Sequence, residues 1–339
     1  MIQSPHDALF RVVFAQLEHA RGELRTIVPA ALAKELDWST LMLRPDSLID
    51  SALSRQYTDL QYSARWCDGS EVLVCFLFEH QSSPPTEGLM GLRLLGYQVR
   101  IWEGFRRDHP KTEKLPTIIP IVMYHGERPW PEPRSFDALL DVPDAVRPAA
   151  EPYLVRFSYL LHDLSKLSEE ELRSGAQRTA LAKLVSMCFK YARTSTDFIK
   201  ILSDWMDVAR EVARAPNGLA ALAPVLRYIL EVNKHVEQAA LEALLESKIG
   251  PEAKDAVVTA GQQLIEQGRQ EGRQEGRQEG RQEAHQRLQA LLLRMLRQRF
   301  GRAVDPQAEQ HVAAASDEQL ETWTERVPSA TTLSELFAD

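Results

Sequence analysis

The stretch Gln56–Gln81, QYTDLQYSARWCDGSEVLVCFLFEHQ, predicts the centre of the fold. Two runs rich in aliphatic and aromatic residues flank Asp68-Gly69, and an Asp-Gly pair between such runs is typical of a β-hairpin. Residues Val72–Phe78 are apolar at every position, which a strand tolerates only when both of its faces are covered. We therefore expect an antiparallel strand pair whose second strand is central in a sheet.

Polar residues end this apolar run, at Glu79-His80-Gln81. A carboxylate without a partner is costly in an apolar setting, so Glu79 calls for one. A divalent cation would serve, and Asp59 on the first strand supplies a second carboxylate. Hard oxygen ligands of this kind suit Mg²⁺. The pattern predicts that Asp59 and Glu79 together hold a Mg²⁺ ion.

This hypothesis also predicts the register of the hairpin. A two-residue loop would place Asp59 opposite Phe78, and Asp59 and Glu79 would then lie on opposite faces of the sheet. A three-residue loop would place Asp59 opposite Leu77, with Glu79 opposite Tyr57 and diagonal to Asp59 on the same face. We therefore expect a loop of odd length, or an equivalent bulge, between the two strands.

An acidic residue, a turn and a hydrophobic strand that ends in Glu-x-Gln resemble the PD-(D/E)XK nuclease core. With His6-Asp7 and Phe10 upstream, and Ile121–Gly126 (IVMYHG) downstream, the chain resembles the recombination-promoting nuclease family. Members of this family are also described as PD-(D/E)XK family transposases. The glycine repeat near the C-terminus is also similar to what such proteins carry.

This resemblance implies a metal-dependent DNA endonuclease, associated with recombination or transposition, that cleaves phosphodiester bonds. Asp59, Glu79 and Gln81 would be its catalytic residues, with Asp59 and Glu79 as the metal ligands. In the family a His-Asp pair near the N-terminus lies close to the active site, which gives His6 and Asp7 an auxiliary role.

Two of these assignments have alternatives. The last position of the PD-(D/E)XK pattern is usually Lys, and Gln81 carries no charge. The chain could therefore be a catalytically inactive, nuclease-like module that binds DNA or protein. Ser4-Pro5-His6-Asp7 also reads as a helix start, in which Asp7 is a capping residue rather than part of a site.

Composition places the chain among ordinary soluble proteins, with 44% hydrophobic and 26% charged residues. It has no apolar run of membrane-spanning length, and its N-terminus lacks the regions of a signal peptide, which predicts a cytoplasmic protein without a membrane partner. Three cysteines without metal-type spacing fit a reducing compartment. No Walker-type glycine loop, Gly-x-Gly-x-x-Gly or Gly-x-Ser-x-Gly is present, which argues against nucleotide hydrolases, dehydrogenases and serine hydrolases.

The net charge of −8 is concentrated near the C-terminus, because residues 303–339 hold eight acidic residues and one Arg. DNA binding needs only a local basic path. A long helix predicted at 88–107 could supply it, with Arg93 and Arg100 as candidate phosphate contacts.

The chain is expected to be an α/β protein with a PD-(D/E)XK-like mixed central sheet flanked by helices, followed by helical parts. We predict a nuclease domain at 1–165, a helical extension at 166–250, a linker with Gly-Arg-Gln-Glu repeats at 251–283 and a small helical domain at 284–339. Further elements are predicted as a helix at 21–36 and strands at 40–49, 116–124 and 153–161.

Residues 268–283 are four copies of Gly-Arg-Gln-Glu. On a helix a four-residue step keeps each residue type in its own stripe, so like charges stand next to one another and each Gly costs about 1 kcal/mol against Ala. Alone, such a helix should be unstable; beside a second copy, the glycine stripe allows close approach. The repeat thus predicts a homo-oligomer, and a disordered linker is the alternative.

Overall fold

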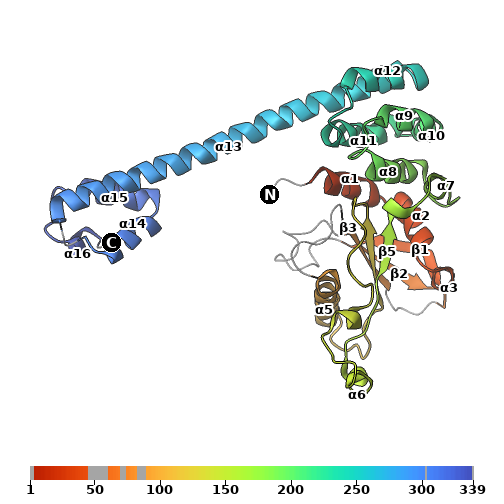
Figure 1. The fold of residues 1–339 in the computed structure, drawn as a ribbon, viewed down its shortest axis with the longest axis horizontal. Helices are drawn as coiled ribbons and strands as arrows, with labels where there is room; N and C mark the ends of the chain where they lie inside the picture. Colours follow the sequence, from red (N-terminus) through yellow and green to blue (C-terminus); the bar gives the residue numbers. More distant parts are fainter. Residues whose placement is uncertain (1–3, 45–59, 69–73, 82–88, 302–303, 338–339) are drawn as a thin grey trace. The chain divides into compact units, whose positions relative to one another are not determined.

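The computed structural model of the chain describes residues 4–44, 60–68, 74–81, 89–301 and 304–337 (Figure 1). They fall into two compact units, Met1–Gln262 and Gln263–Asp339. The finer four-part division that we expected from the sequence stays a prediction. Each unit has a hydrophobic core of its own, and the two are described separately below.

One five-stranded sheet lies at the centre of the first unit, in the order β1-β2-β3-β4-β5. The first three strands pair antiparallel, and the last three pair parallel. The fold is therefore mixed α/β with a mixed sheet, as we expected. The strands are β1 (Leu36–Leu43), β2 (Leu60–Trp66), β3 (Val74–Gln81), β4 (Ile118–Tyr124) and β5 (Leu160–Asp163).

Helices cover both faces of the sheet. On one face, Leu94 and Tyr97 of α5 (Met90–Asp108) pack with Val122 of β4. On the other face, α1 (Pro5–Phe14) and α2 (Leu17–Ile27) pack on strand residues such as Ile121. Because neighbouring residues of a strand point to opposite faces, a strand between two helical layers must be apolar throughout. The run of six buried residues that ends β4 meets this requirement.

The helices that follow the sheet share its core. Trp205, Tyr228 and Leu245 belong to the same buried cluster as the sheet residue Ile121. Local signals begin two of these helices: Ser168 forms a capping box with Glu171, and the Thr179 hydroxyl accepts from the Ala182 amide. The helices are α7 (Glu169–Arg173), α8 (Ala180–Tyr191), α9 (Phe198–Asp204), α10 (Met206–Arg214), α11 (Gly218–Val232) and α12 (Gln238–Lys248).

Three predicted elements have different bounds in the structure. The helix expected at 21–36 ends at Ile27, and a short helix, α3 (Ala30–Ala33), follows Pro29. Proline disfavours helical backbone at the residue before it, and Val28 is accordingly extended. The first strand therefore starts at Leu36 rather than near Thr40. The last strand is Leu160–Asp163, later than the expected 153–161, because Glu151–Tyr153 form a 3₁₀ turn.

The helix start predicted at Ser4-Pro5 is present, with Pro5 in the first turn of α1. Its capping bond is not: the Ser4 side chain accepts no hydrogen bond from the helix. Proline at this position lacks an N–H that the helix would leave unpaired anyway, and its backbone angle is already helical. The helix therefore begins where the sequence predicts, through the proline rather than the serine.

The second unit is helical and packs around Leu292, Leu296 and Trp323. Its helices are the C-terminal part of α13 (Pro251–Phe300), α14 (Pro306–Ala314), α15 (Asp317–Arg326) and α16 (Leu333–Leu336). The Gly-Arg-Gln-Glu repeats lie within α13 and are helical. Among the residues that the structure describes, no helix combines the length and the apolar character needed to cross a membrane.

Candidate active site

Three parallel strands end at one edge of the sheet. β3 ends at Gln81, β4 at Tyr124 and β5 at Asp163, and the register pairs Gln81 with Tyr124 and Tyr124 with Asp163. The carboxyl ends of parallel strands are where α/β proteins commonly bind their ligands. This edge is therefore the candidate active site.

Glu79 and Gln81 are among the last three residues of β3, directly at this edge. Glu79 pairs with Val122 and Gln81 with Tyr124 in the β3–β4 register. Directly paired residues share a face of a sheet, and Val122 packs with α5. Positions 79 and 81 therefore lie on the α5 face. Asp59, the other predicted metal ligand, lies outside the described residues.

The register of the β2–β3 hairpin differs from the one that we predicted. Leu77 lies opposite Gln61, not opposite Asp59. The connection between the last described pair, Ala64 and Val74, has nine residues, which is an odd number as predicted. The predicted pairing is nevertheless wrong by two residues, because it would leave seven residues, not nine, between Ala64 and its partner on the second strand.

His6 and Asp7 lie in the first turn of α1, on the face of the sheet opposite α5. The hydroxyl of Tyr228 in α11 lies 2.8 Å from Nδ1 of His6. Burial raises the pKa of Tyr228 well above its usual value, with a further upward effect of Cys188, so this hydroxyl stays protonated while it shares a hydrogen bond with the imidazole. His6 is thereby held by a residue 222 positions away in the chain.

His125, directly after β4, lies beside His6. The two ring centroids are 5.0 Å apart. Nδ1 of His125 lies 3.0 Å from the carbonyl oxygen of Phe189, on whose ring the imidazole also stacks. Such a bond is typical of a structural histidine at the end of a strand. The contact of His125 with His6 was not foreseen.

Asp163 is a buried carboxylate at the end of β5. It accepts hydrogen bonds from the amide and hydroxyl of Ser165, at 3.1 and 2.5 Å, and Nζ of Lys166 lies 3.5 Å away. Burial lowers the pKa of the nearby Lys190, while Asp163 and Glu171 raise it. Burial, and then Asp163, raises the pKa of Tyr124. No sequence pattern had drawn attention to Asp163.

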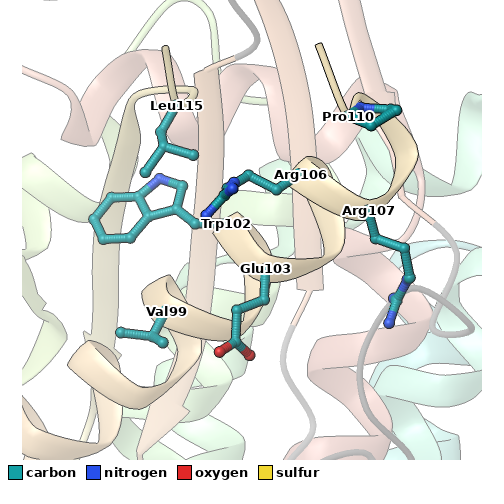
Figure 2. A pocket seen from close by; sticks show the side chains of 7 residues that line it. All are labelled: Val99, Trp102, Glu103, Arg106, Arg107, Pro110 and Leu115. Carbon is teal, nitrogen blue, oxygen red and sulfur yellow. The ribbon is translucent and has the colours of Figure 1, made fainter. Parts of the chain in front are cut away.

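Arg93 and Arg100, the candidate phosphate contacts, lie seven residues apart on α5, with Arg93 half-buried and Arg100 exposed. Arg107 continues this spacing near the end of the helix. Beside it lies a pocket of about 530 Å³. Figure 2 shows its apolar side chains, Val99, Trp102 and Leu115, together with Glu103, Arg106, Arg107 and Pro110. A helix rises 1.5 Å per residue, so Arg107 lies about 21 Å along the axis from Arg93.

A buried ion pair joins α2 to the segment before α8. Nε of Arg178 donates to Glu23 at 2.7 Å, and neither side chain is more than 1% exposed. Nε2 of His162 on β5 lies 3.2 Å from the second oxygen of Glu23. Burial by itself raises the pKa of Glu23, but Arg178 and His162 together hold it below its usual value. This network is structural, and no local pattern predicted it.

The described residues contain no group of three or more His, Cys, Asp or Glu side chains able to hold a metal ion. Asp59 and the side chain of Glu79 are not among them, so the predicted metal ligands stay a proposal. The site that the structure does describe is the strand edge itself, with His6, His125 and Tyr228 approaching from the face opposite α5.

Comparison with known families identifies the chain. The model of a family described as "Putative transposase, YhgA-like" matches residues 4–220, which is more than half of the sequence. The chain belongs to this family. The matched range includes the strand edge and the two candidate arginines of α5, and it ends before Tyr228.

Three curated proteins from Escherichia coli K12 are similar to this chain. Recombination-promoting nuclease RpnA is 27% identical over 270 residues, which is 79% of this chain and 85% of RpnA. Inactive recombination-promoting nuclease-like protein RpnE is 32% identical over 182 residues, 54% of this chain and 58% of RpnE. Recombination-promoting nuclease RpnC is 33% identical over 130 residues, 38% of this chain and 41% of RpnC.

The chain thus spans less than two thirds of RpnE and RpnC and most of RpnA. No solved structure matches this YhgA-like chain. The resemblance to the recombination-promoting nucleases, noted from Glu79-His80-Gln81 and the motifs on either side, is confirmed.

Proposed function

We propose that this protein is a metal-dependent DNA endonuclease of the PD-(D/E)XK type, whose active site lies at the carboxyl edge of β3. The register of β3 and β4 carries this proposal, because it brings positions 79 and 81 to the end of a central parallel strand. The relatives named as recombination-promoting nucleases support the same activity.

Asp59 and Glu79 would hold the metal ion, and carboxylate oxygens fit a hard cation such as Mg²⁺. A bound divalent ion polarises the phosphodiester and lowers the pKa of its bound water. Gln81 would orient the attacking water through its amide, which donates and accepts hydrogen bonds but cannot take up a proton. His6, held by Tyr228, also lies near this edge and has a ring that can accept or donate a proton, but it is on the face of the sheet opposite positions 79 and 81.

DNA would approach along α5, which borders the face of positions 79 and 81. Arg93 and Arg100 point to a basic path for the phosphates, and Arg107 extends it toward the end of the helix. A few such contacts are enough for local binding in a chain with a net charge of −8, since phosphate contacts are made side chain by side chain.

Cleavage of supercoiled plasmid tests the proposal. Wild-type protein is expected to nick plasmid with Mg²⁺ or Mn²⁺ and to stop when EDTA removes the metal. Asp59→Ala and Glu79→Ala should each abolish nicking, while Asp141→Ala, which removes an exposed carboxylate of the same unit, should leave it unchanged. Nicking by Asp59→Ala or Glu79→Ala at the wild-type rate would exclude that residue from the site.

A second candidate function is a catalytically inactive module that binds DNA or protein. Two observations favour it: Gln81 stands where the PD-(D/E)XK pattern usually has Lys, and the relative RpnE is named as inactive. This alternative would be favoured if the wild-type protein shifts a DNA fragment in a gel but does not cleave plasmid with Mg²⁺, Mn²⁺ or Co²⁺. In that case Gln81→Lys is the variant to assay for restored cleavage.

A further inference from the structure

A second pocket lies in the first unit, away from the sheet. Its volume is about 310 Å³, and it is formed where α10, the end of α12 and the start of α13 meet. It takes no residue from the strand edge or from α5. Its lining is Arg210, Ala213, Arg214, Leu219, Lys248, Ile249, Gly250, Glu252 and Ala253.

Cations dominate this lining. Arg210, Arg214 and Lys248 carry three positive charges against the single carboxylate of Glu252, a net charge of +2. Within the described part of the chain, none of the three cations forms an ion pair with a carboxylate. Arg210 is half-buried, and its Nε donates to the backbone carbonyl of Lys248 at 2.7 Å. This bond fixes the guanidinium at the pocket without neutralising it.

Glu246, an acidic residue near the pocket, forms an ion pair with a lysine that is not part of the pocket lining. Glu246, two residues before Lys248, lies 3.0 Å from the ammonium of Lys254, and this ion pair draws its carboxylate to α13. Helix C-termini attract cations, which accounts for one basic residue at the end of α10 and one at the end of α12. It does not account for three on one concave surface, because like charges in proximity repel one another.

The backbone at Gly250 brings the two sides of the pocket together. Its φ of +143° lies in a region that L side chains rarely adopt, so the turn from α12 to α13 depends on glycine. This turn places Lys248 and Glu252, which belong to successive helices, on the lining of the same pocket. The cations thus come from two helices, α10 and α12, rather than from one.

We propose that this pocket binds a small phosphate-bearing anion. Guanidinium and ammonium groups together form the donor set that recognises phosphate, through charge-assisted hydrogen bonds. A pocket of about 310 Å³ lies at the lower end of the size range of small-molecule sites. A concave site of this size fits a diphosphate or a nucleotide better than a DNA backbone, which spreads its phosphates over an extended surface.

Titration calorimetry on the full chain tests this inference, with sodium pyrophosphate and ATP as probes and sodium sulfate at equal ionic strength as the reference. Pyrophosphate or ATP should bind saturably at one site per chain. Arg214→Gln and Lys248→Gln should each weaken binding about tenfold or more, since each removes a hydrogen bond to a charged group. Both side chains are exposed, so the substitutions should leave the core intact.

Lys200→Gln is the matched control, because Lys200 is an exposed residue of the same unit outside the pocket. It should bind pyrophosphate as the wild type does, whereas Glu252→Gln should bind it more tightly. No saturable binding of either probe up to millimolar concentration would overturn the proposal. Equal affinity of Lys200→Gln and Lys248→Gln for pyrophosphate would also overturn it. So would a result in which the protein binds a DNA duplex through Arg214 and Lys248 but binds neither probe. The test uses no cleavage assay, so its outcome is independent of the proposed nuclease activity.

Discussion

Glu23 and Arg178 illustrate how single residues hold the first unit together. Both are buried, and Arg178 also donates to the carbonyl of Leu172 and the hydroxyl of Ser186. A buried pair of charges contributes little net stability compared with apolar residues, but loss of one partner leaves the other charge buried and unpaired. The pair is therefore a site at which a single substitution has a large effect.

Arg178→Met should lower the free energy of unfolding by about 3–5 kcal/mol, because it leaves the Glu23 carboxylate without its cation. Arg156→Met, which breaks an exposed ion pair with Glu151, should change the free energy of unfolding far less, because solvent and salt screen exposed ion pairs. Urea unfolding at neutral pH, followed by circular dichroism, measures both. Equal losses in the two variants would contradict the structural role of the buried pair.

The same pair predicts a dependence of stability on pH. The pKa of Glu23 is lowered in the folded chain by Arg178 and His162, against the effect of burial. A carboxyl whose pKa is lower in the folded state contributes stability above its unfolded pKa of about 4.3 and loses it as pH falls through the folded value. Wild-type protein should therefore lose stability below about pH 4.3 more steeply than Glu23→Gln/Arg178→Met, in urea unfolding across pH 3–7. Parallel curves for the two proteins would contradict this.

At the scale of elements, the Gly-Arg-Gln-Glu repeat raises a question about α13. Its four glycines, at 268, 272, 276 and 280, lie on a helix, and an added Cβ at each would meet nothing within 4 Å. Each glycine lowers helix stability by about 1 kcal/mol compared with alanine. A partner helix that needs close approach would offset this loss, and it is the reason that we propose self-association.

Deletion of residues 268–283 should shift the protein toward a smaller mass in light scattering. Replacement of the four repeat glycines by alanine is the sharper variant, because it keeps every charge and favours the helix while it blocks close approach. It should raise the helix content in circular dichroism and still weaken association. An unchanged mass in both variants would favour a solvated helix or linker that spaces two units.

At the scale of the whole molecule, the two units have separate cores. The core of the first extends from Leu9 to Ala260, and that of the second from Leu292 to Leu336. The second includes acidic helices that largely account for the negative charge of the chain, and Arg297 of α13 pairs with Glu309 at 2.6 Å. Each unit buries its own apolar surface, so each should fold by itself.

The fragment 1–262 should unfold cooperatively, with a thermal midpoint within a few degrees of that of the same unit in the full chain. The fragment 1–220, which ends where the family match ends, should not. It lacks most of α11 and all of α12, and with them Tyr228 and Leu245 of the common core. Differential scanning calorimetry of the two fragments measures this. A cooperative transition in the shorter fragment would show that the late helices are dispensable for the sheet.

The sequence by itself determined the elements whose signals are local. The Asp68-Gly69 pair and the apolar run before Glu79 predicted the antiparallel strand pair and its central second strand, and Pro5 predicted the start of α1. These predictions succeed because hydrophobic periodicity, proline and turn residues act on the backbone of adjacent residues. Such signals can be read from the sequence without knowledge of the tertiary structure. The motif around Glu79, in combination with His6-Asp7 upstream and Ile121–Gly126 downstream, also led to the family.

Tertiary structure decided which distant residues meet. Nothing near His6 indicates that Tyr228 will hold its ring, and nothing near Glu23 indicates Arg178, because each partner lies more than 150 residues away in sequence. The register of β2 and β3 also differed, by two residues, from the expected one. A shift of two residues keeps each position on the same face of the sheet, so the alternation of apolar and polar residues does not reveal it. Local pattern determines what an element is, whereas burial of the common core determines what it touches.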